Sequence, residues 1–419
     1  MSMRKGTKKI RVLVVMGTRP EVIKLAPVVE ALKAFGRDEA KGKRGRGKRF
    51  ETRVCLTGQH REMVEPFLKV FDIKPDYDLR VMEPNQHLAE VAGKVLIGMK
   101  KILAEEKPDW VLVQGDTTSA MAAALAAFYA RVRVGHVEAG LRTEDRFNPF
   151  PEEINRRLIS PLADLNFAPT ERARQNLLAE GISEERVLVT GNTVVDALQM
   201  ILKKAEKEKR DWRGEVRRIG TEDGLREIGR EKLREGKAGR EKARGEKAER
   251  KKKLILVTAH RRESFGRGME EICRAIRAVV EKVPEAEAVF PVHLNPEVRR
   301  VVLRELAGFE RIWLVEPVDY LTFVRMMKEA SLIMTDSGGI QEEAPSLGVP
   351  VVVMREKTER PEAVEAGVAW IGGTQAERIE RLALRLLRKV ENGEFRRGLK
   401  RRNPFGDGRA SQRIARALR

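Results

Sequence analysis

Residues 332–353 read LIMTDSGGIQEEAPSLGVPVVV. An apolar run, paired glycines, a helical stretch and a second β-branched run predict a strand, a turn, a helix and another strand. Gly338 and Gly339 either permit a tight turn or present backbone N–H groups to a diphosphate at the start of the helix. Glu342 and Glu343 either complement the helix dipole in its first turn or accept hydrogen bonds from ribose hydroxyls.

The same alternation of strand and helix patterns runs through the whole chain. Helical patterns such as residues 20–35 and 119–130 separate short β-branched runs, which is typical of a parallel α/β fold. A chain of 419 residues with 42% hydrophobic residues can bury two cores. We therefore expect an α/β protein with two doubly wound, Rossmann-like domains. The expected strands are residues 10–16, 52–56, 110–114, 132–137, 165–168, 187–190, 254–258, 287–292, 312–315, 331–335, 350–354 and 369–371.

Two segments outside these patterns carry most of the positive charge. The net charge is +20; residues 37–49, with seven bases and two acids, carry +5, and residues 203–253, with 21 bases and 12 acids, carry +9. Because the remainder is only mildly basic, we do not expect a nucleic-acid partner. We expect a basic loop insert at 37–49 in a first domain of residues 1–202, a charged low-complexity insert at 203–253, and a second domain at 254–402.

The sequence favours a reducing, aqueous compartment. Cys55 and Cys273 fit neither a disulfide framework nor metal-ligand spacing. The apolar run near the N-terminus is too short for a signal peptide, and no stretch has the length of a membrane span. No G-x-G-x-x-G motif follows the first strand. We therefore expect a cytoplasmic protein with no membrane partner, no metal ion and no nicotinamide cofactor.

Charged and polar residues follow most of the predicted strands. Because ligands of open α/β sheets bind at the carboxyl ends of strands, these residues predict an anionic, hydroxyl-rich ligand in a cleft between the domains. Single residues also have structural alternatives: Arg19 could face solvent, His260 could cap its strand, and Asp116 could cap a helix. Met326 and Met327 are expected in the core. The strand-end segments are residues 17–24, 57–61, 114–118, 136–142, 258–266, 291–296, 316–319 and 335–339.

Nine segments occur in order: GTRPEVIKLAPVV, TGQHREM, QGDTTSAMAAALAAFY, VGHVEAGLRTEDRFNPFPEEINRR, TGNTVVDAL, TAHRRESFGRG, PVHLNP, TDSGGIQEEAPSLGVP and TERPEAVEAG. Together with the C-terminal NPFGDGRASQRI, they resemble the non-hydrolysing UDP-N-acetylglucosamine 2-epimerases, and only the two basic inserts are unmatched. The resemblance implies a glycosyltransferase-B-like fold with the active site in the interdomain cleft. It also implies a C-terminal helix, residues 403–419, that crosses back to the first domain, and a homodimer.

The resemblance assigns roles to individual residues. Ser337, Gly338 and Gly339 would bind the diphosphate, Glu343 the ribose, and Phe323 would lie near the uracil. Some relatives bind a second substrate molecule as activator, which implies an allosteric role for Gln59, His60 and His293. The implied substrate-binding residues are Arg19, Lys24, Asp116, Glu138, Arg156, His260, Phe323, Ser337, Gly338, Gly339, Glu343 and Arg360, and the implied catalytic residues are Asp116, Glu138, Glu152 and His260.

The implied reaction interconverts UDP-N-acetylglucosamine and UDP-N-acetylmannosamine. C2 of the sugar is not next to a carbonyl, so its proton is not acidic. Anti elimination of UDP to 2-acetamidoglucal, followed by readdition with a proton on the other face, avoids this barrier and needs acid–base groups near C2. The sequence leaves open which carboxylate removes the proton. A hydrolysing epimerase, which releases N-acetylmannosamine, and a UDP-sugar glycosyltransferase are alternatives with the same fold.

Overall fold

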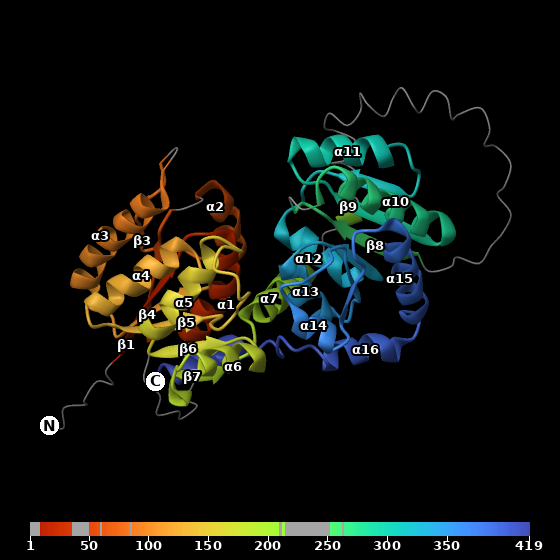
Figure 1. Cartoon of the computed structure of the whole chain (residues 1–419). Coiled ribbons are helices and arrows are strands. Elements are labelled where there is room, and N and C mark those ends of the chain that lie inside the picture. The colour runs from red at the N-terminus through yellow and green to blue at the C-terminus, as the bar shows by residue number, and fades with distance from the viewer. Residues whose placement is uncertain are drawn as a thin grey trace, which may run out of the picture. The chain divides into compact units, whose positions relative to one another are not determined.

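The computed structural model describes residues 9–35, 50–58, 61–83, 86–208, 212–213, 252–261 and 264–419. The predicted basic loop at 37–49, most of the predicted insert at 203–253, and Gln59 and His60 lie outside these residues. The chain divides into two compact units, each described by itself (Figure 1). Unit 1 comprises residues 1–201 and 405–419, and unit 2 comprises residues 202–404.

Unit 1 is built around a parallel sheet with helices on its faces. In its described part the sheet has seven strands in the order β3-β2-β1-β4-β5-β6-β7. The strands are β1 (Ile10–Met16), β2 (Phe50–Leu56), β3 (Tyr77–Asp78), β4 (Trp110–Gln114), β5 (Arg133–Val137), β6 (Leu165–Ala168) and β7 (Val187–Val189). The helices are α1 (Arg19–Phe35), α2 (Arg61–Val70), α3 (Leu88–Glu106), α4 (Thr118–Tyr129), α5 (Glu152–Leu162), α6 (Glu171–Ala179), the 3₁₀ helix η2 (Glu184–Arg186), α7 (Thr193–Glu208) and α17 (Ala410–Ala417).

Unit 2 repeats this construction. The sheet in its described part has six strands in the order β10-β9-β8-β11-β12-β13. The strands are β8 (Lys253–Thr258), β9 (Ala286–Pro291), β10 (Ile312–Val315), β11 (Leu332–Thr335), β12 (Val351–Val353) and β13 (Ala369–Ile371). The helices are α10 (Arg267–Lys282), α11 (Pro296–Leu306), α12 (Tyr320–Glu329), α13 (Gly338–Leu347), α14 (Pro361–Glu365), α15 (Ala376–Lys389) and α16 (Gly393–Arg401).

The strand residues explain the two sheets. Both sheets are buried on two faces, so their central strands are nearly continuous runs of apolar residues, such as the fully buried β4 and β11. Every strand predicted from the sequence is present, and the two parallel sheets confirm the predicted α/β fold with two Rossmann-like domains. The two-residue strand β3 was not predicted, because two residues show no periodicity. Met326 and Met327 are fully buried, as predicted.

The strand order fixes where ligands can bind. In each sheet the first strand of the unit is flanked on both sides: β1 by β2 and β4, and β8 by β9 and β11. At such a switch point the loops after the two neighbouring strands diverge and leave a crevice at their carboxyl ends. The crevice of unit 1 is therefore expected outside β1 and β4, and that of unit 2 outside β8 and β11. In the described part of the chain, no helix has the length and apolar character needed to cross a membrane.

Candidate active site

In unit 1, the buried carboxylate of Glu21 joins the loops that follow β1 and β4. Its Oε2 accepts hydrogen bonds from the backbone N–H groups of Gly17 (2.7 Å) and Thr18 (2.6 Å). Its Oε1 accepts one from the hydroxyl of Thr117, in the loop after β4 (2.8 Å). Burial raises the pKa of Glu21, and these hydrogen bonds oppose the shift. The two loops at the switch point are thus held by one side chain.

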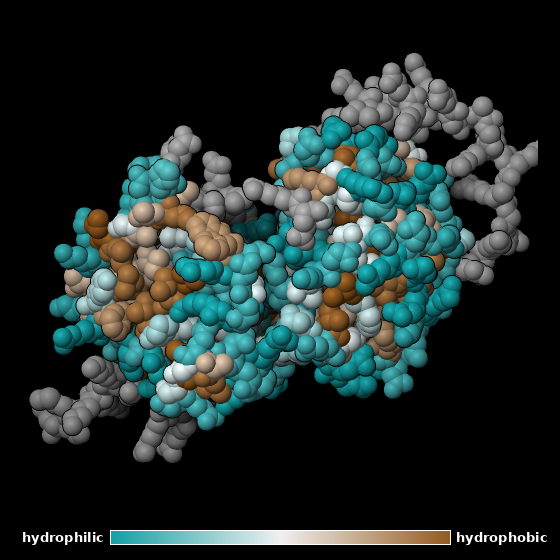
Figure 2. All heavy atoms as spheres, in the orientation of Figure 1, coloured by the Kyte–Doolittle hydropathy of each residue, from teal (hydrophilic) through white to brown (hydrophobic). Residues whose placement is uncertain are grey.

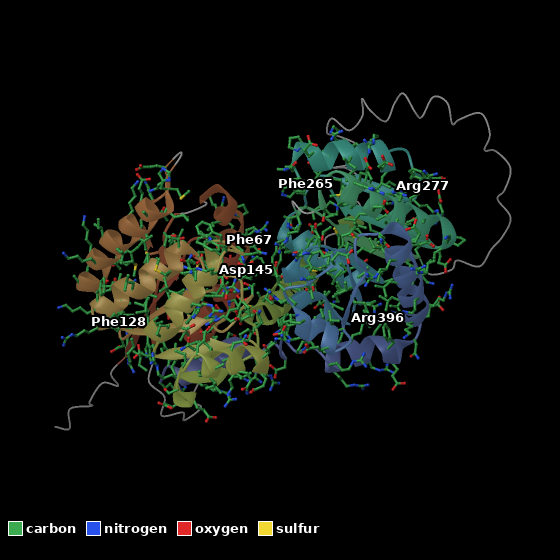
Figure 3. All side chains as sticks on the ribbon, in the orientation of Figure 1. Phe67, Phe128, Asp145, Phe265, Arg277 and Arg396 are labelled. Carbon is green, nitrogen blue, oxygen red and sulfur yellow. The ribbon has the colours of Figure 1, made fainter. Side chains whose placement is uncertain are left out.

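Arg19 lies at the start of α1, directly after this loop. The side chain is exposed, in agreement with the solvent-facing alternative, and its guanidinium lies 5.8 Å from the ring centre of Phe67 on α2 (Figure 3). Among the described residues, no carboxylate forms an ion pair with Arg19. Its charge therefore remains available to an anion at the carboxyl end of β1.

Glu138 is the most constrained of the predicted catalytic carboxylates. It follows β5, takes a left-handed backbone conformation with φ 66° and is only 7% exposed. Both of its carboxylate oxygens lie 2.5 Å from Nζ of Lys24, and the side-chain amide of Gln114 donates a hydrogen bond to Oε2. The amide of Asn192 donates another to Oε1 at 3.4 Å. A non-glycine residue at positive φ is held there only by its surroundings, which is common at functional sites.

Asp116, in the loop after β4, is tied to α5. Its carboxylate forms an ion pair with Arg156 at 2.7 Å, and its backbone carbonyl accepts a hydrogen bond from the side chain of Asn155 at 2.9 Å. The alternative that Asp116 caps α4 is wrong, because Thr117 is the N-cap and accepts the hydrogen bond from the N–H of Ala120.

Glu152 and Glu153 begin α5 and have opposite environments. Glu153 is fully buried and is bonded to Arg157 (2.9 Å), to Arg156 (3.5 Å) and to the N–H of Thr143 (3.1 Å). Glu152 has a buried Oε2 with no hydrogen-bond partner among the described residues. A buried carboxylate oxygen without a donor is costly unless a ligand or a proton occupies it, which marks Glu152 as a candidate for acid–base work.

In unit 2, Asp336 organises the loop after β8. It is fully buried, and its Oδ2 accepts hydrogen bonds from the N–H groups of His260 (2.7 Å) and Arg261 (2.8 Å). Nδ1 of His260 lies 3.3 Å from Oδ1. Burial raises the pKa of Asp336, but the contacts and charge of His260 and the two N–H groups bring it below its ordinary value. The His260 ring also stacks on that of His293, with ring centres 5.6 Å apart.

The N-terminus of α13 has backbone geometry that suits an anion. Ser337 is its N-cap residue, and Gly338 and Gly339 are its first two residues. Neither glycine has a positive φ; among the described residues, a Cβ on Gly338 would come no closer than 3.9 Å to its neighbours, and one on Gly339 would contact nothing within 4 Å. The tight-turn interpretation is therefore wrong. A Cβ on Gly338 would lie 4.0 Å from the guanidinium groups of Arg261 and Arg360 and 3.9 Å from a carboxylate oxygen of Glu359, so two arginines and one carboxylate border the start of the helix.

Two carboxylates follow on the same helix. Glu342 is buried and paired with Nε of Arg360, and Glu343, 7% exposed, accepts a hydrogen bond from the hydroxyl of Tyr320 at 3.3 Å. Both lie beyond the first turn of α13, so the dipole interpretation is wrong for both. Phe323 is half-buried on α12, next in sequence to the buried Thr322.

Side-chain and backbone contacts bring together two groups of predicted residues, one in each unit. In unit 1, hydrogen bonds and ion pairs connect the loops and helix that carry Asp116, Glu138 and Glu152; in unit 2, His260 and the start of α13 meet at Asp336. Within the described residues, no group of three or more His, Cys, Asp or Glu side chains is placed to hold a metal ion.

Sequence reasoning missed six residues that hold the site together: Glu21, Gln114, Asn192, Arg261, Tyr320 and Asp336. All but Asn192 and Tyr320 belong to the strand-end segments given above or to the helix that follows β1.

Comparison with known proteins places the chain in a family. A family model described as UDP-N-acetylglucosamine 2-epimerase matches residues 43–419. A UDP-N-acetylglucosamine 2-epimerase of Yersinia pestis is 49% identical over 410 residues, which cover 98% of each chain. The crystal structure of UDP-GlcNAc 2-epimerase from Neisseria meningitidis bound to UDP-GlcNAc is 41% identical, with a TM-score of 0.76 and coverage of 98% of this chain and 99% of the other. The Methanocaldococcus jannaschii UDP-GlcNAc 2-epimerase in complex with UDP-GlcNAc and UDP is 33% identical, with a TM-score of 0.70 and coverage of 98% and 99%.

These matches extend over nearly the whole length of the chain and confirm the resemblance found in its strand-end segments. The chain belongs to the UDP-N-acetylglucosamine 2-epimerase family.

Proposed function

We propose that this protein is a non-hydrolysing UDP-N-acetylglucosamine 2-epimerase that interconverts UDP-N-acetylglucosamine and UDP-N-acetylmannosamine. The observation that carries the proposal is a cluster of three carboxylates in unit 1, Asp116, Glu138 and Glu152, which we call the acid–base group. In it, Glu138 is held by three donors, while Glu152 keeps a buried oxygen without a hydrogen-bond partner among the described residues. Family membership and relatives crystallised with UDP-GlcNAc support the choice of substrate.

Unit 2 supplies the features that bind a nucleoside diphosphate. The N–H groups of Gly338 and Gly339, with the guanidinium groups of Arg261 and Arg360, suit the two phosphates. Glu343 on the same helix is placed to accept hydrogen bonds from ribose hydroxyls. His260, oriented by Asp336, is an additional donor for the oxygen through which UDP leaves.

The chemistry requires two proton transfers on opposite faces of C2. In the first step a base removes the C2 proton while the bond from C1 to the UDP oxygen breaks, giving 2-acetamidoglucal and UDP. In the second step UDP adds back to C1 while an acid delivers a proton to the other face of C2. The sequence of steps is redox-neutral, so it needs no nicotinamide, and donors in unit 2 stabilise the charge of departing UDP.

Glu152 is the carboxylate assigned to one of these two proton transfers. Its unpartnered Oε2 can take up a proton without breaking any hydrogen bond of the folded protein. Protonation of Glu138, in contrast, would weaken its contacts with Lys24 and with two amides. Glu138 is therefore given the role of fixing the position of Lys24 next to the reacting sugar, and Asp116 with Arg156 forms a second charged pair of the group.

The product distinguishes this proposal from its closest alternative. Protein incubated with UDP-N-acetylglucosamine alone should give a mixture of the two UDP-sugars, measured by proton NMR of the anomeric signals, with no net loss of UDP-sugar. Accumulation of free N-acetylmannosamine with an equal amount of UDP would instead identify a hydrolysing enzyme. A Glu152→Gln preparation, purified in parallel, controls for contaminating epimerase.

We also propose that the protein forms a homodimer through α3, α4 and α5 of unit 1. These helices pack side by side, and Ile97, Phe128, Tyr129 and Leu158 on them are 49–70% exposed. Figure 2 shows a hydrophobic patch over this part of unit 1, and Figure 3 places Phe128 on α4 within it. A contiguous exposed apolar surface of this kind marks a protein interface, and a second copy of the same chain presents a matching surface.

A further inference from the structure

The C-terminal segment packs closely on the turn between β7 and α7 in unit 1. The carbonyl of Phe405 accepts a hydrogen bond from the N–H of Asn192 at 2.8 Å. Next to it, Gly406 and Gly191 face each other so tightly that a Cβ on Gly406 would lie 3.0 Å from the Cα of Gly191. Phe405 and Asn192 are each only 2% exposed, so this contact excludes solvent.

A second contact clamps the segment onto α7 at the start of α17. The carboxylate of Asp196 accepts hydrogen bonds from the N–H groups of Ala410 (3.2 Å) and Ser411 (2.9 Å) and from the Ser411 hydroxyl (2.5 Å). Asp196 is 5% exposed, and burial raises its pKa against these hydrogen bonds. The guanidinium of Arg413 donates to the carbonyl of Thr190 at 2.9 Å. Residues 405–413 are thus fixed on both sides of Asn192.

Asn192 links this docked segment to the acid–base group. Its backbone N–H binds Phe405, its Oδ1 caps α7 by accepting the N–H of Val194 (3.0 Å), and its Nδ2 donates to Oε1 of Glu138. The oxygen and the nitrogen of the side-chain amide each form a hydrogen bond, and the position of Asn192 depends on the contact with Phe405. Glu138 is a residue at positive φ that its surroundings must hold in place.

We propose that docking of the C-terminal segment positions the acid–base group of unit 1. The contact with Phe405 fixes Asn192, and Asn192, as the positioning residue, fixes the carboxylate of Glu138. The inference rests on the proposed function in that Glu138 belongs to the epimerase site. It extends the site to a segment of the chain that follows unit 2 in sequence and returns to unit 1. Loosening the segment should therefore lower turnover without changing how tightly UDP binds to unit 2.

The test is a double-mutant cycle with Gly406→Ala and Asn192→Ser. The added methyl of Gly406→Ala separates the segment from Gly191, whereas Asn192→Ser keeps a cap for α7 but cannot reach Glu138. Asn192→Ser should lower kcat about tenfold, the loss expected for one hydrogen bond to a charged group, with KM nearly unchanged. Gly406→Ala should lower kcat several-fold, and the double variant should be no slower than Asn192→Ser, because both act through one contact.

Gly181→Ala is the matched control for backbone strain. Gly181 has a positive φ of 82°, but a Cβ there would contact nothing within 4 Å, so it should destabilise the fold without changing kcat. If Gly406→Ala fails to fold, Ser411→Ala weakens the same docking by one hydrogen bond and replaces it in the cycle. A double variant whose loss equals the product of the two single losses would overturn the proposal.

A second readout separates this inference from the proposed function. In ¹⁵N-labelled protein without substrate, Gly406→Ala should shift the Asn192 side-chain amide signals, and Gly181→Ala should leave them in place. This result is independent of turnover, so a wild-type protein that lacks epimerase activity would contradict the proposed function alone. Unshifted Asn192 signals in folded Gly406→Ala would contradict the positioning role.

Discussion

Two adjacent glutamates at the start of α5 show how the same side chain serves two purposes. Glu153 is bonded to two arginines and a backbone N–H, so it builds the fold of the loop that precedes α5. Glu152 has an oxygen that is buried and without a hydrogen-bond partner among the described residues, so this oxygen contributes no hydrogen bond to the fold. We therefore explain Glu152, near the carboxyl ends of the strands of unit 1, by a role in the reaction and not by a role in the fold.

Substitution of Glu152 should therefore separate activity from stability. Glu152→Gln keeps the shape but removes the acid–base group, and we expect kcat to fall on the order of 10²–10⁴-fold while the midpoint of thermal unfolding stays within a few degrees of wild type. The measurement is a pair of steady-state assays and melting curves. Glu144→Gln, in the same loop but largely exposed, is the control and should retain full activity. A Glu152→Gln enzyme with wild-type kcat would rule out the assigned role.

His136 on β5 predicts a dependence of stability on pH. Its Nε2–H donates to the carbonyl of Gly115 at 2.7 Å, and burial lowers its pKa from 6.5 to about 4. The unfolded chain takes up a proton below about pH 6.5, whereas the folded chain does so only near pH 4, so stability falls as the pH drops through this window. Between pH 7 and pH 4 the loss is roughly 3 kcal/mol.

His136→Gln should remove this contribution to the pH dependence of stability, because glutamine retains an N–H for the carbonyl of Gly115 but does not titrate. Denaturant unfolding at pH 7 and pH 4 should show the wild type losing about 3 kcal/mol more than the variant over this range. If the wild type and the variant lost equal stability between pH 7 and pH 4, folding would not lower the pKa of His136, and the prediction would be wrong.

At the scale of elements, the start of α13 combines a helix N-terminus with two glycines that the backbone does not require. Neither Gly338 nor Gly339 has a positive φ, and alanine would fit at both positions. Alanine is also the better helix former, by up to about 1 kcal/mol. The absence of side chains here therefore lowers the stability of the helix, which is explained if phosphates must approach its N–H groups.

Gly339→Ala should accordingly leave the fold as stable as wild type or slightly more stable, and weaken UDP binding about tenfold or more. Calorimetric titration with UDP measures the affinity. Gly393→Ala is a matched control, because Gly393 also lies in the first turn of a helix, α16, and a Cβ there meets only the end of the Arg397 side chain at 3.9 Å among the described residues. Undiminished UDP affinity in Gly339→Ala would show that the phosphates bind elsewhere.

The elements could be predicted from the sequence because their signals are local. Strand periodicity and the rule that ligands bind at carboxyl strand ends were enough to place Asp116, Glu138 and His260 on the correct edge of each sheet. The residues that hold them could not be predicted, because their contacts depend on tertiary packing. Asn192 is 54 positions from Glu138, and Asp336 is 76 positions from His260.

At the scale of the whole molecule, each of the two units uses a buried carboxylate to hold the loop that follows its first strand. In each, a buried carboxylate accepts hydrogen bonds from two backbone N–H groups of the loop after the first strand: Glu21 binds the loop after β1, and Asp336, which follows β11, binds the loop after β8. Fixing these loops preorganises the groups that they carry, Arg19 in unit 1 and His260 in unit 2. In the proposed reaction, preorganised charge needs no rearrangement when UDP leaves, and this is where electrostatic catalysis gains most.

The exposed apolar face of unit 1 predicts the state of assembly. Ile97→Lys places a charge in the proposed dimer interface and should shift the protein from dimer to monomer at low micromolar concentration, measured by light scattering after gel filtration. Leu294→Lys is the control, because Leu294 is as exposed as Ile97, 64% against 65%, but lies in unit 2. A wild-type protein that is monomeric at all concentrations would contradict the dimer proposal.

The central claim, that UDP leaves and returns around a 2-acetamidoglucal, is tested most directly by epimerisation in D₂O. The account predicts that UDP-N-acetylmannosamine formed from UDP-N-acetylglucosamine carries deuterium at C2, seen as loss of the C2 proton signal in NMR, because the new proton comes from a carboxylic acid that exchanges with solvent. Epimerised product that retains hydrogen at C2 throughout the reaction would contradict it.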